Sequence, residues 1–164
     1  MTERDDRHDL PALGRRLEAA QKRFAGMRES TQRDPGPTDP ATGESWHRGN
    51  VLGHVNEMLP FWTEQIRLAN AGSGKVGRDE SGAKSRRRGI DSGNEAAERR
   101  LRLDVEQGIG AVLLLMDGMS PADLERKVVF TTREGSREAE VGELLQFLIV
   151  RHLEDHLEQL AELG

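Results

Sequence analysis

Four segments of this 164-residue chain repeat apolar residues at the three- and four-residue spacing of an α-helix, and this periodicity constrains the fold more than any other feature. The segments cover about residues 9–27, 45–69, 95–116 and 141–163. Helices with one apolar stripe bury it by packing side by side. Only 4% of the residues are aromatic, so the core is expected to be mostly aliphatic. The pattern predicts an all-α fold, a four-helix bundle, forming a single domain over residues 1–164.

Two long connecting segments are predicted to be loops. Residues 28–44 are rich in Pro, Gly and Thr, and residues 71–94 are rich in Gly. The second loop is expected to be the most mobile internal segment, because its composition cannot build a core. The charged residues 1–8 are expected to be flexible.

A small extended excursion is predicted before the last helix. In "SPADLE", residues 120–125, Ser120 can cap a short helical turn and Pro121 suits its first position. Apolar residues then alternate on both sides of Glu134 and Gly135. This alternation predicts a hairpin over about residues 127–140, where all of the strand content is expected.

Composition excludes several classes of protein. The chain has no cysteine, which excludes disulfides, thiolate zinc sites, iron–sulfur clusters and a cysteine nucleophile. A net charge of −5 argues against a nucleic-acid partner. No apolar run approaches the roughly 18 residues that cross a bilayer, and no secretory signal is visible. A cytoplasmic protein without a membrane partner is therefore expected.

Two histidines one helical turn apart are the first candidate for a functional site. At 100° per residue, with Val141 at zero, His152 and His156 fall at about 20° and 60°, in the middle of the predicted apolar face. Most carboxylates of this helix, including that of Glu154, fall on the opposite face. A surface pair is thus the least favoured interpretation, and a hydrogen-bonded core pair and a pair of metal ligands both stay open.

His54, on the second predicted helix, can complete the site. It flanks an apolar stripe and can face the bundle interior, although a single histidine there is more often a hydrogen-bonded core residue. With His152 and His156 it would give three ring nitrogens and leave a further position open for water or substrate. The zinc-protease motif His-Glu-x-x-His is excluded, because Leu153 follows His152.

The sequences "WHRGNVLGHVNEMLPFW" and "VGELLQFLIVRHLEDHLEQL" resemble the DinB/YfiT-like superfamily of metalloenzymes. The resemblance implies that His54, His152 and His156 hold a divalent metal inside a four-helix bundle. The superfamily includes S-transferases and isomerases that use low-molecular-weight thiols such as bacillithiol or mycothiol. The cofactors implied are therefore a metal, zinc or nickel, together with a small thiol.

The leading hypothesis is a metal-dependent enzyme that acts on a small molecule, as a thiol-dependent S-transferase or a related metal-assisted transferase or hydrolase. Glu57, one turn after His54, is the candidate catalytic proton shuttle, and a solvated surface residue is an equal alternative. His47 lies two turns before His54, too far for the same ion, and is expected at the pocket mouth. The basic run at residues 84–88 is a solvated loop or attracts an anionic thiol.

The rival hypothesis is a non-catalytic metal-binding or stress-related helical bundle that acts as a binding or dimerisation module. A closed site with four protein ligands would favour this rival. In that case Gly108 and Gly110 of the third helix are candidates for a homodimer contact.

Overall fold

The structure is a computed structural model that describes residues 4–164. The first three residues of the N-terminal segment expected to be flexible lie outside the described residues. Beyond them, Asp6 is buried and its backbone N–H donates to Gln146 Oε1 at 2.6 Å, so this part of the segment packs against the last helix.

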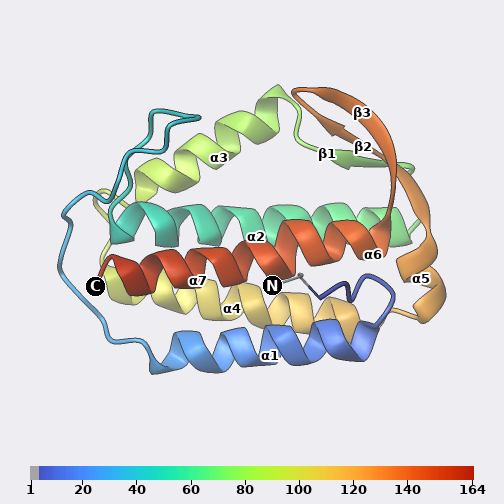
Figure 1. The fold of residues 1–164 in the computed structure, drawn as a ribbon, viewed down its shortest axis with the longest axis horizontal. Helices are drawn as coiled ribbons and strands as arrows, with labels where there is room; N and C mark the ends of the chain where they lie inside the picture. The colour runs from blue at the N-terminus through green and yellow to red at the C-terminus, as the bar shows by residue number, and fades with distance from the viewer. Residues whose placement is uncertain (1–3) are drawn as a thin grey trace.

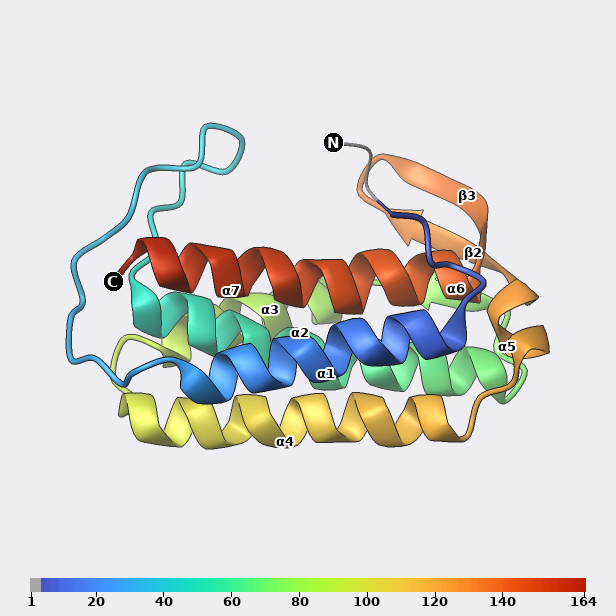
Figure 2. The ribbon, with the colours of Figure 1, turned by 60° about the horizontal axis from the view of Figure 1, so that its bottom comes forward.

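Most of the described chain is helical, as the apolar periodicity predicts. The long helices α1 (Leu10–Gly26), α2 (Arg48–Asn70) and α4 (Glu98–Asp117) run alongside a C-terminal helix (Figures 1 and 2). This C-terminal helix consists of α6 (Val141–Leu144), a π-helical stretch η1 (Leu145–Arg151) and α7 (His152–Glu162). One mainly aliphatic core fills the space between these helices. No helix among residues 4–164 is long and apolar enough to cross a membrane.

A three-stranded sheet lies at one end of the helices (Figure 1). The predicted hairpin is confirmed as β2 (Lys127–Thr132) and β3 (Gly135–Glu140), and the predicted short helix before it is α5 (Pro121–Glu125). The expectation that the hairpin holds all of the strand content is wrong. A further strand, β1 (Lys75–Gly77), pairs with β2 in parallel, and a three-residue strand carries too little pattern to be recognised in the sequence.

The prediction of a loop over residues 71–94 is also wrong, because this segment contains β1 and the helix α3 (Glu80–Ser92). Its glycines serve helix packing. A Cβ added at Gly49 of α2 would lie 2.1 Å from the carbonyl oxygen of Gly93, and one at Gly53 would lie 2.3 Å from that of Gly89. The glycines therefore allow α2 and α3 to cross with their backbones in contact, which no larger residue permits.

The other predicted loop, residues 28–44, is free of helix and lies near the opposite end of the bundle from the sheet (Figure 2). Its second half forms a compact flap, defined here as residues 36–46. Gly36 N–H donates to the Trp46 carbonyl at 2.9 Å, and Asp39 N–H donates to the Glu44 carbonyl at 2.8 Å. The flap therefore holds Trp46 directly before α2 begins.

Candidate metal site

Three histidine rings meet between α2 and α7. One potential ligand nitrogen from each of His54, His152 and His156 lies within 4.8 Å of the others. His54 Nε2 and His152 Nε2 are 3.2 Å apart, and the ring centroids of His152 and His156 are 4.7 Å apart. The structure thus brings together the three residues that the sequence selected.

The π-helical stretch η1 sets the direction of the C-terminal pair. A π turn accommodates an extra residue, which rotates the residues that follow by about 100° relative to an uninterrupted α-helix. Leu153, Leu157 and Leu160 accordingly occupy the core, while His152 and His156 lie at its flank with intermediate exposure. The expectation that both histidines lie in the middle of the apolar face is wrong for this reason.

Hydrogen bonds define which ring nitrogens carry a free lone pair. His152 Nδ1 lies 3.3 Å from the Leu148 carbonyl oxygen, and His156 Nδ1 lies 2.9 Å from Gln159 Oε1. Both partners are acceptors, so each Nδ1 is the protonated nitrogen and each Nε2 carries the lone pair. His156 Nε2 and His54 Nδ1 are buried without a hydrogen-bond partner, and an unsatisfied buried polar atom costs about 1–3 kcal/mol.

Burial keeps all three rings neutral. Desolvation is the main cause that lowers the pKa of His54 to about 2, and the nearby His156 and His152 rings add to it. Desolvation likewise is the main cause that lowers the pKa of His152 to about 3, and the nearby His156 ring lowers it further. The pKa of His156 is lowered by the same desolvation, which its bond to Gln159 and the charge of Asp155 oppose. Neutral imidazole is the form that binds a metal.

The donor set fits a divalent ion that prefers imidazole. Two nitrogen ligands at about 2.0–2.1 Å from a tetrahedral zinc ion are separated by roughly 3.3 Å. The His54 and His152 nitrogens are 3.2 Å apart, and the free His156 lone pair is buried beside them. Among residues 4–164, the cluster contains no fourth histidine or carboxylate. Three neutral ligands therefore leave a position open and leave the charge of a bound ion uncompensated.

A cavity of about 370 Å³, called here the histidine cavity, opens beside the three rings. The flap supplies one wall, where Trp46 lies with its ring centroid 5.1 Å from that of His54 and 6.0 Å from that of His156. Arg86 of α3 supplies the other wall and pairs with Glu44 of the flap at 3.5 Å. The residues that line the cavity are Pro37, Asp39, Thr42, Glu44, Trp46, His54, Arg86, His152, His156 and Gln159.

A family model described as the DinB superfamily matches residues 6–160, nearly the whole chain. The chain belongs to the DinB superfamily. The resemblance carried by the two histidine-containing segments is thereby confirmed, and metal binding is common in this superfamily. No curated protein and no solved structure matches the chain.

Other predicted residues of this DinB-superfamily chain lie outside the histidine cavity. Both carboxylate oxygens of Glu57 accept hydrogen bonds from Arg78, and the pair is largely buried, so Glu57 is not the solvated residue of the alternative interpretation. His47 caps α2, where its Nδ1 accepts from the Asn50 N–H at 3.3 Å, and it does not line the cavity mouth as expected.

Sequence reasoning missed the flap, Trp46 and Gln159. Gln159 lies three residues after His156, which places it within reach on the same helix face, so helical spacing contained that signal. The sequence around Trp46 and Glu44 does not indicate that they line the cavity, because their position depends on how the flap folds back over α2. Of the basic run, Arg86 lines the cavity and Arg87 pairs with Glu44 at 3.1 Å, from a helix and not from a loop.

Proposed function

We propose that this protein is a metal-dependent enzyme in which His54, His152 and His156 hold a divalent ion, zinc or nickel. The observation that carries the proposal is the unpaired His156 Nε2, a buried lone pair on a ring whose centroid lies 4.8 Å from that of His54 and 4.7 Å from that of His152. A hydrogen-bonded core cluster would satisfy this atom with a donor, and among the described residues no donor is present. A metal ion removes the cost of that orphan nitrogen.

When bound, the ion would act as a Lewis acid toward a water or a thiol at the open position. The protein's own residues prepare that position. The Leu148 carbonyl and the Gln159 side chain fix the ring orientations of His152 and His156, as the hydrogen-bond partners of ligand histidines usually do. Trp46 and the flap form one wall beside this position, and the Arg86–Glu44 pair lines the other.

A thiol-dependent S-transferase is the reaction class that we propose for this site. Because the chain contains no cysteine, the thiol would come from a small molecule that enters the histidine cavity. A thiolate fits a site where three neutral ligands leave the metal charge uncompensated. No residue of the cavity wall is assigned here as the proton shuttle, since Arg78 occupies both oxygens of Glu57.

An exposed apolar face of α4 is the feature that favours the non-catalytic alternative. Leu103 and Leu114 of α4 are exposed, Leu114 by 74%, and a Cβ added at Gly110 would meet open space. A homodimer through this face is the form that a binding module would take. Gly108 is unavailable to it, because a Cβ there would lie 3.1 Å from the Leu59 side chain of α2. The three-ligand histidine cluster supports the enzyme over this alternative.

The test separates metal binding from chemistry. Metal-free protein is titrated with Zn²⁺ and Ni²⁺ by calorimetry, and thiolate absorbance of an added small thiol is followed with loaded and metal-free protein. We expect stoichiometric metal binding that each of His54→Ala, His152→Ala and His156→Ala weakens, with His8→Ala as the exposed control. Metal binding without any effect on the acidity of the thiol would reject the S-transferase and retain the metal site.

A further inference from the structure

A second, larger cavity adjoins the histidine cavity. It has a volume of about 690 Å³ and lies where α3, the β2–β3 hairpin and the C-terminal helix face one another. Thr42 and Arg86 line both cavities, so the two cavities are neighbours at Arg86. We call this second cavity the side chamber.

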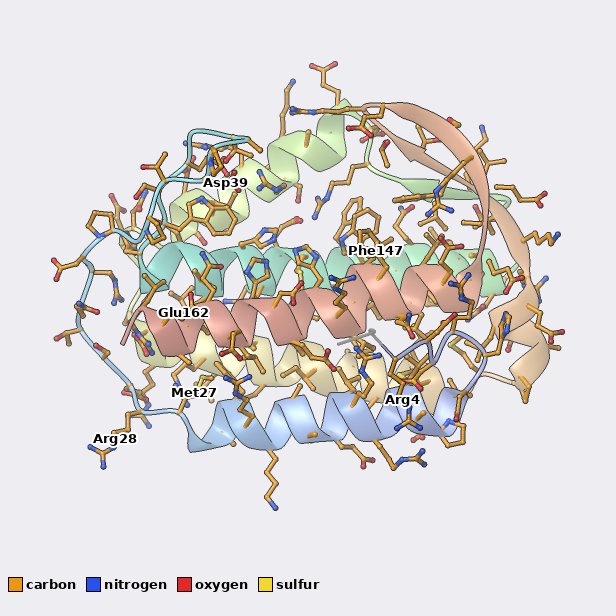
Figure 3. All side chains as sticks on the ribbon, in the orientation of Figure 1. Arg4, Met27, Arg28, Asp39, Phe147 and Glu162 are labelled. Carbon is orange, nitrogen blue, oxygen red and sulfur yellow. The ribbon has the colours of Figure 1, made fainter. Side chains whose placement is uncertain are left out.

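One wall of the side chamber is apolar and aromatic. The chain has only four phenylalanines and two tryptophans, and Phe130, Phe147 and Trp62 all line the chamber. Trp62, Phe130 and Leu148 are core residues with one edge toward it, whereas Phe147 is 52% exposed. Figure 3 shows Phe147 directed from the C-terminal helix toward the side where α3 and the hairpin lie. Together these side chains give an organic ligand an apolar surface to pack on.

One arginine of the side chamber has no carboxylate partner. Among the described residues, Arg133 of the hairpin turn forms no ion pair, whereas Arg86 pairs with Glu44 at 3.5 Å. Arg78 is neutralised by Glu57, and its guanidinium carbon lies 3.9 Å from the centroid of the Phe61 ring and 5.1 Å from that of Trp62.

The two carboxylates of the side chamber have other partners. Asp79 caps α3 by accepting the Gly82 N–H at 2.8 Å. Glu80 pairs with Lys84 at 3.2 Å, and its side chain is 87% exposed. An apolar wall with one unpaired guanidinium group at its rim, that of Arg133, is complementary to an organic anion that has an apolar body.

We propose that the side chamber binds the substrate of this protein, and that the substrate is a small carboxylate with an aromatic or branched aliphatic body. Its body packs on Phe147, Phe130 and Trp62, and its carboxylate lies between Arg133 and Arg86. The other end reaches the histidine cavity past Arg86. The assignment of this ligand as a substrate rests on the proposed function, whereas its binding does not.

The structure couples the side chamber to the histidine site through one residue. Leu148 lines the chamber, and its backbone carbonyl accepts from Nδ1 of His152. A ligand that packs on Leu148 therefore touches the element that orients a histidine of the site. Ligand binding in the side chamber and metal binding at the histidines can therefore be measured on the same protein, and variants of chamber residues separate the two.

The experiment uses metal-free protein, so that its result does not depend on metal loading. The probes are 2-naphthylacetate and its neutral amide, and binding is measured by calorimetry and by backbone amide shifts in NMR spectra. The variants are Phe147→Ser and Arg133→Gln. Their matched controls are Leu103→Ser and Arg100→Gln, which change a leucine that is 49% exposed and an exposed arginine on α4. Thermal unfolding confirms that each variant is folded.

We expect the carboxylate to bind more tightly than the amide, with shifts in residues of β2 and η1. Phe147→Ser should raise the Kd roughly tenfold, as the loss of one buried aromatic face predicts. Arg133→Gln should raise it about threefold for the carboxylate and leave the amide unchanged. Equal binding of both probes, or Kd values that neither variant alters, would overturn the proposal. If the carboxylate binds but the protein has no affinity for Zn²⁺ or Ni²⁺, the proposed ligand site is supported and the metal-dependent function is rejected.

Discussion

Acidification of the metal-free protein tests how the histidines are buried. In the unfolded chain each imidazole has the ordinary pKa of about 6.5, whereas burial lowers the pKa of His54 to about 2 and of His152 to about 3, and also lowers that of His156. Below pH 6.5 the unfolded chain therefore binds protons that the folded chain does not. The free energy of unfolding must then fall as the pH falls, and the loss continues until the folded-state pKa values are reached.

The size of this loss follows from the pH interval. His54 and His152 each contribute about 1.4 kcal/mol per pH unit below 6.5, or roughly 2 kcal/mol at pH 5, and together about 4 kcal/mol. The lowered pKa of His156 acts in the same direction. A domain is stable by only about 5–15 kcal/mol, so the metal-free protein is expected to lose a large part of its stability between pH 7 and pH 5.

The assay is urea unfolding of metal-free protein at pH 8, 6.5 and 5, followed by circular dichroism. The comparison is a variant with glutamine at positions 54, 152 and 156, which keeps polar side chains of similar size but cannot titrate. Wild type should lose several kcal/mol more than this variant between pH 7 and pH 5, while His8→Ala should behave as wild type, because His8 is exposed. Equal losses in wild type and the glutamine variant would refute the burial argument.

Four further changes test the packing of the helices. Gly93→Ala should detach α3 and lower the free energy of unfolding by more than about 2 kcal/mol, since its Cβ would lie 1.8 Å from a backbone oxygen of α2. Gly110→Ala lies in open space on α4 and should raise the free energy of unfolding by about 0.5–1 kcal/mol. Thermal unfolding measures both changes. Glu98→Gln should cost about 3 kcal/mol or more in urea unfolding, because it leaves Arg48 as a buried unpaired cation. His47→Ala removes the N-cap of α2 and should lower the free energy of unfolding by about 1 kcal/mol. The metal content of this variant should equal that of wild type. A Gly93→Ala protein as stable as wild type, or a metal loss in His47→Ala, would contradict these assignments.

The long helices and the histidine cluster could be predicted because their signals are local. Apolar residues at helical spacing identify α1, α2, α4 and the C-terminal helix. His152 and His156 share a helix, so their one-turn spacing brings their rings together in any helical fold. His54 could be added because it flanks the apolar stripe of its helix, and the resemblance to a family supported the choice.

The missed parts depend on contacts between distant segments. In residues 71–94 the glycines indicate a loop when read locally, yet Gly89 and Gly93 are needed where α3 meets α2. The π turn in η1 rotates every later residue of the helix about the helix axis, and no residue pattern in the stretch Leu145–Arg151 predicts it. Glu57 was selected by its distance along α2 from His54, but Arg78, from a segment 21 residues away, determines what it contacts.

The central claim is that His54, His152 and His156 bind one divalent ion. The most direct measurement is elemental analysis of protein purified without chelator, for wild type, for His8→Ala and for the double variant His152→Ala with His156→Ala. The account predicts about one zinc or nickel ion per chain in wild type and in His8→Ala, and none in the double variant, which keeps only one imidazole of the site. Stoichiometric metal in a folded double variant would show that the ion is bound elsewhere and would contradict the account.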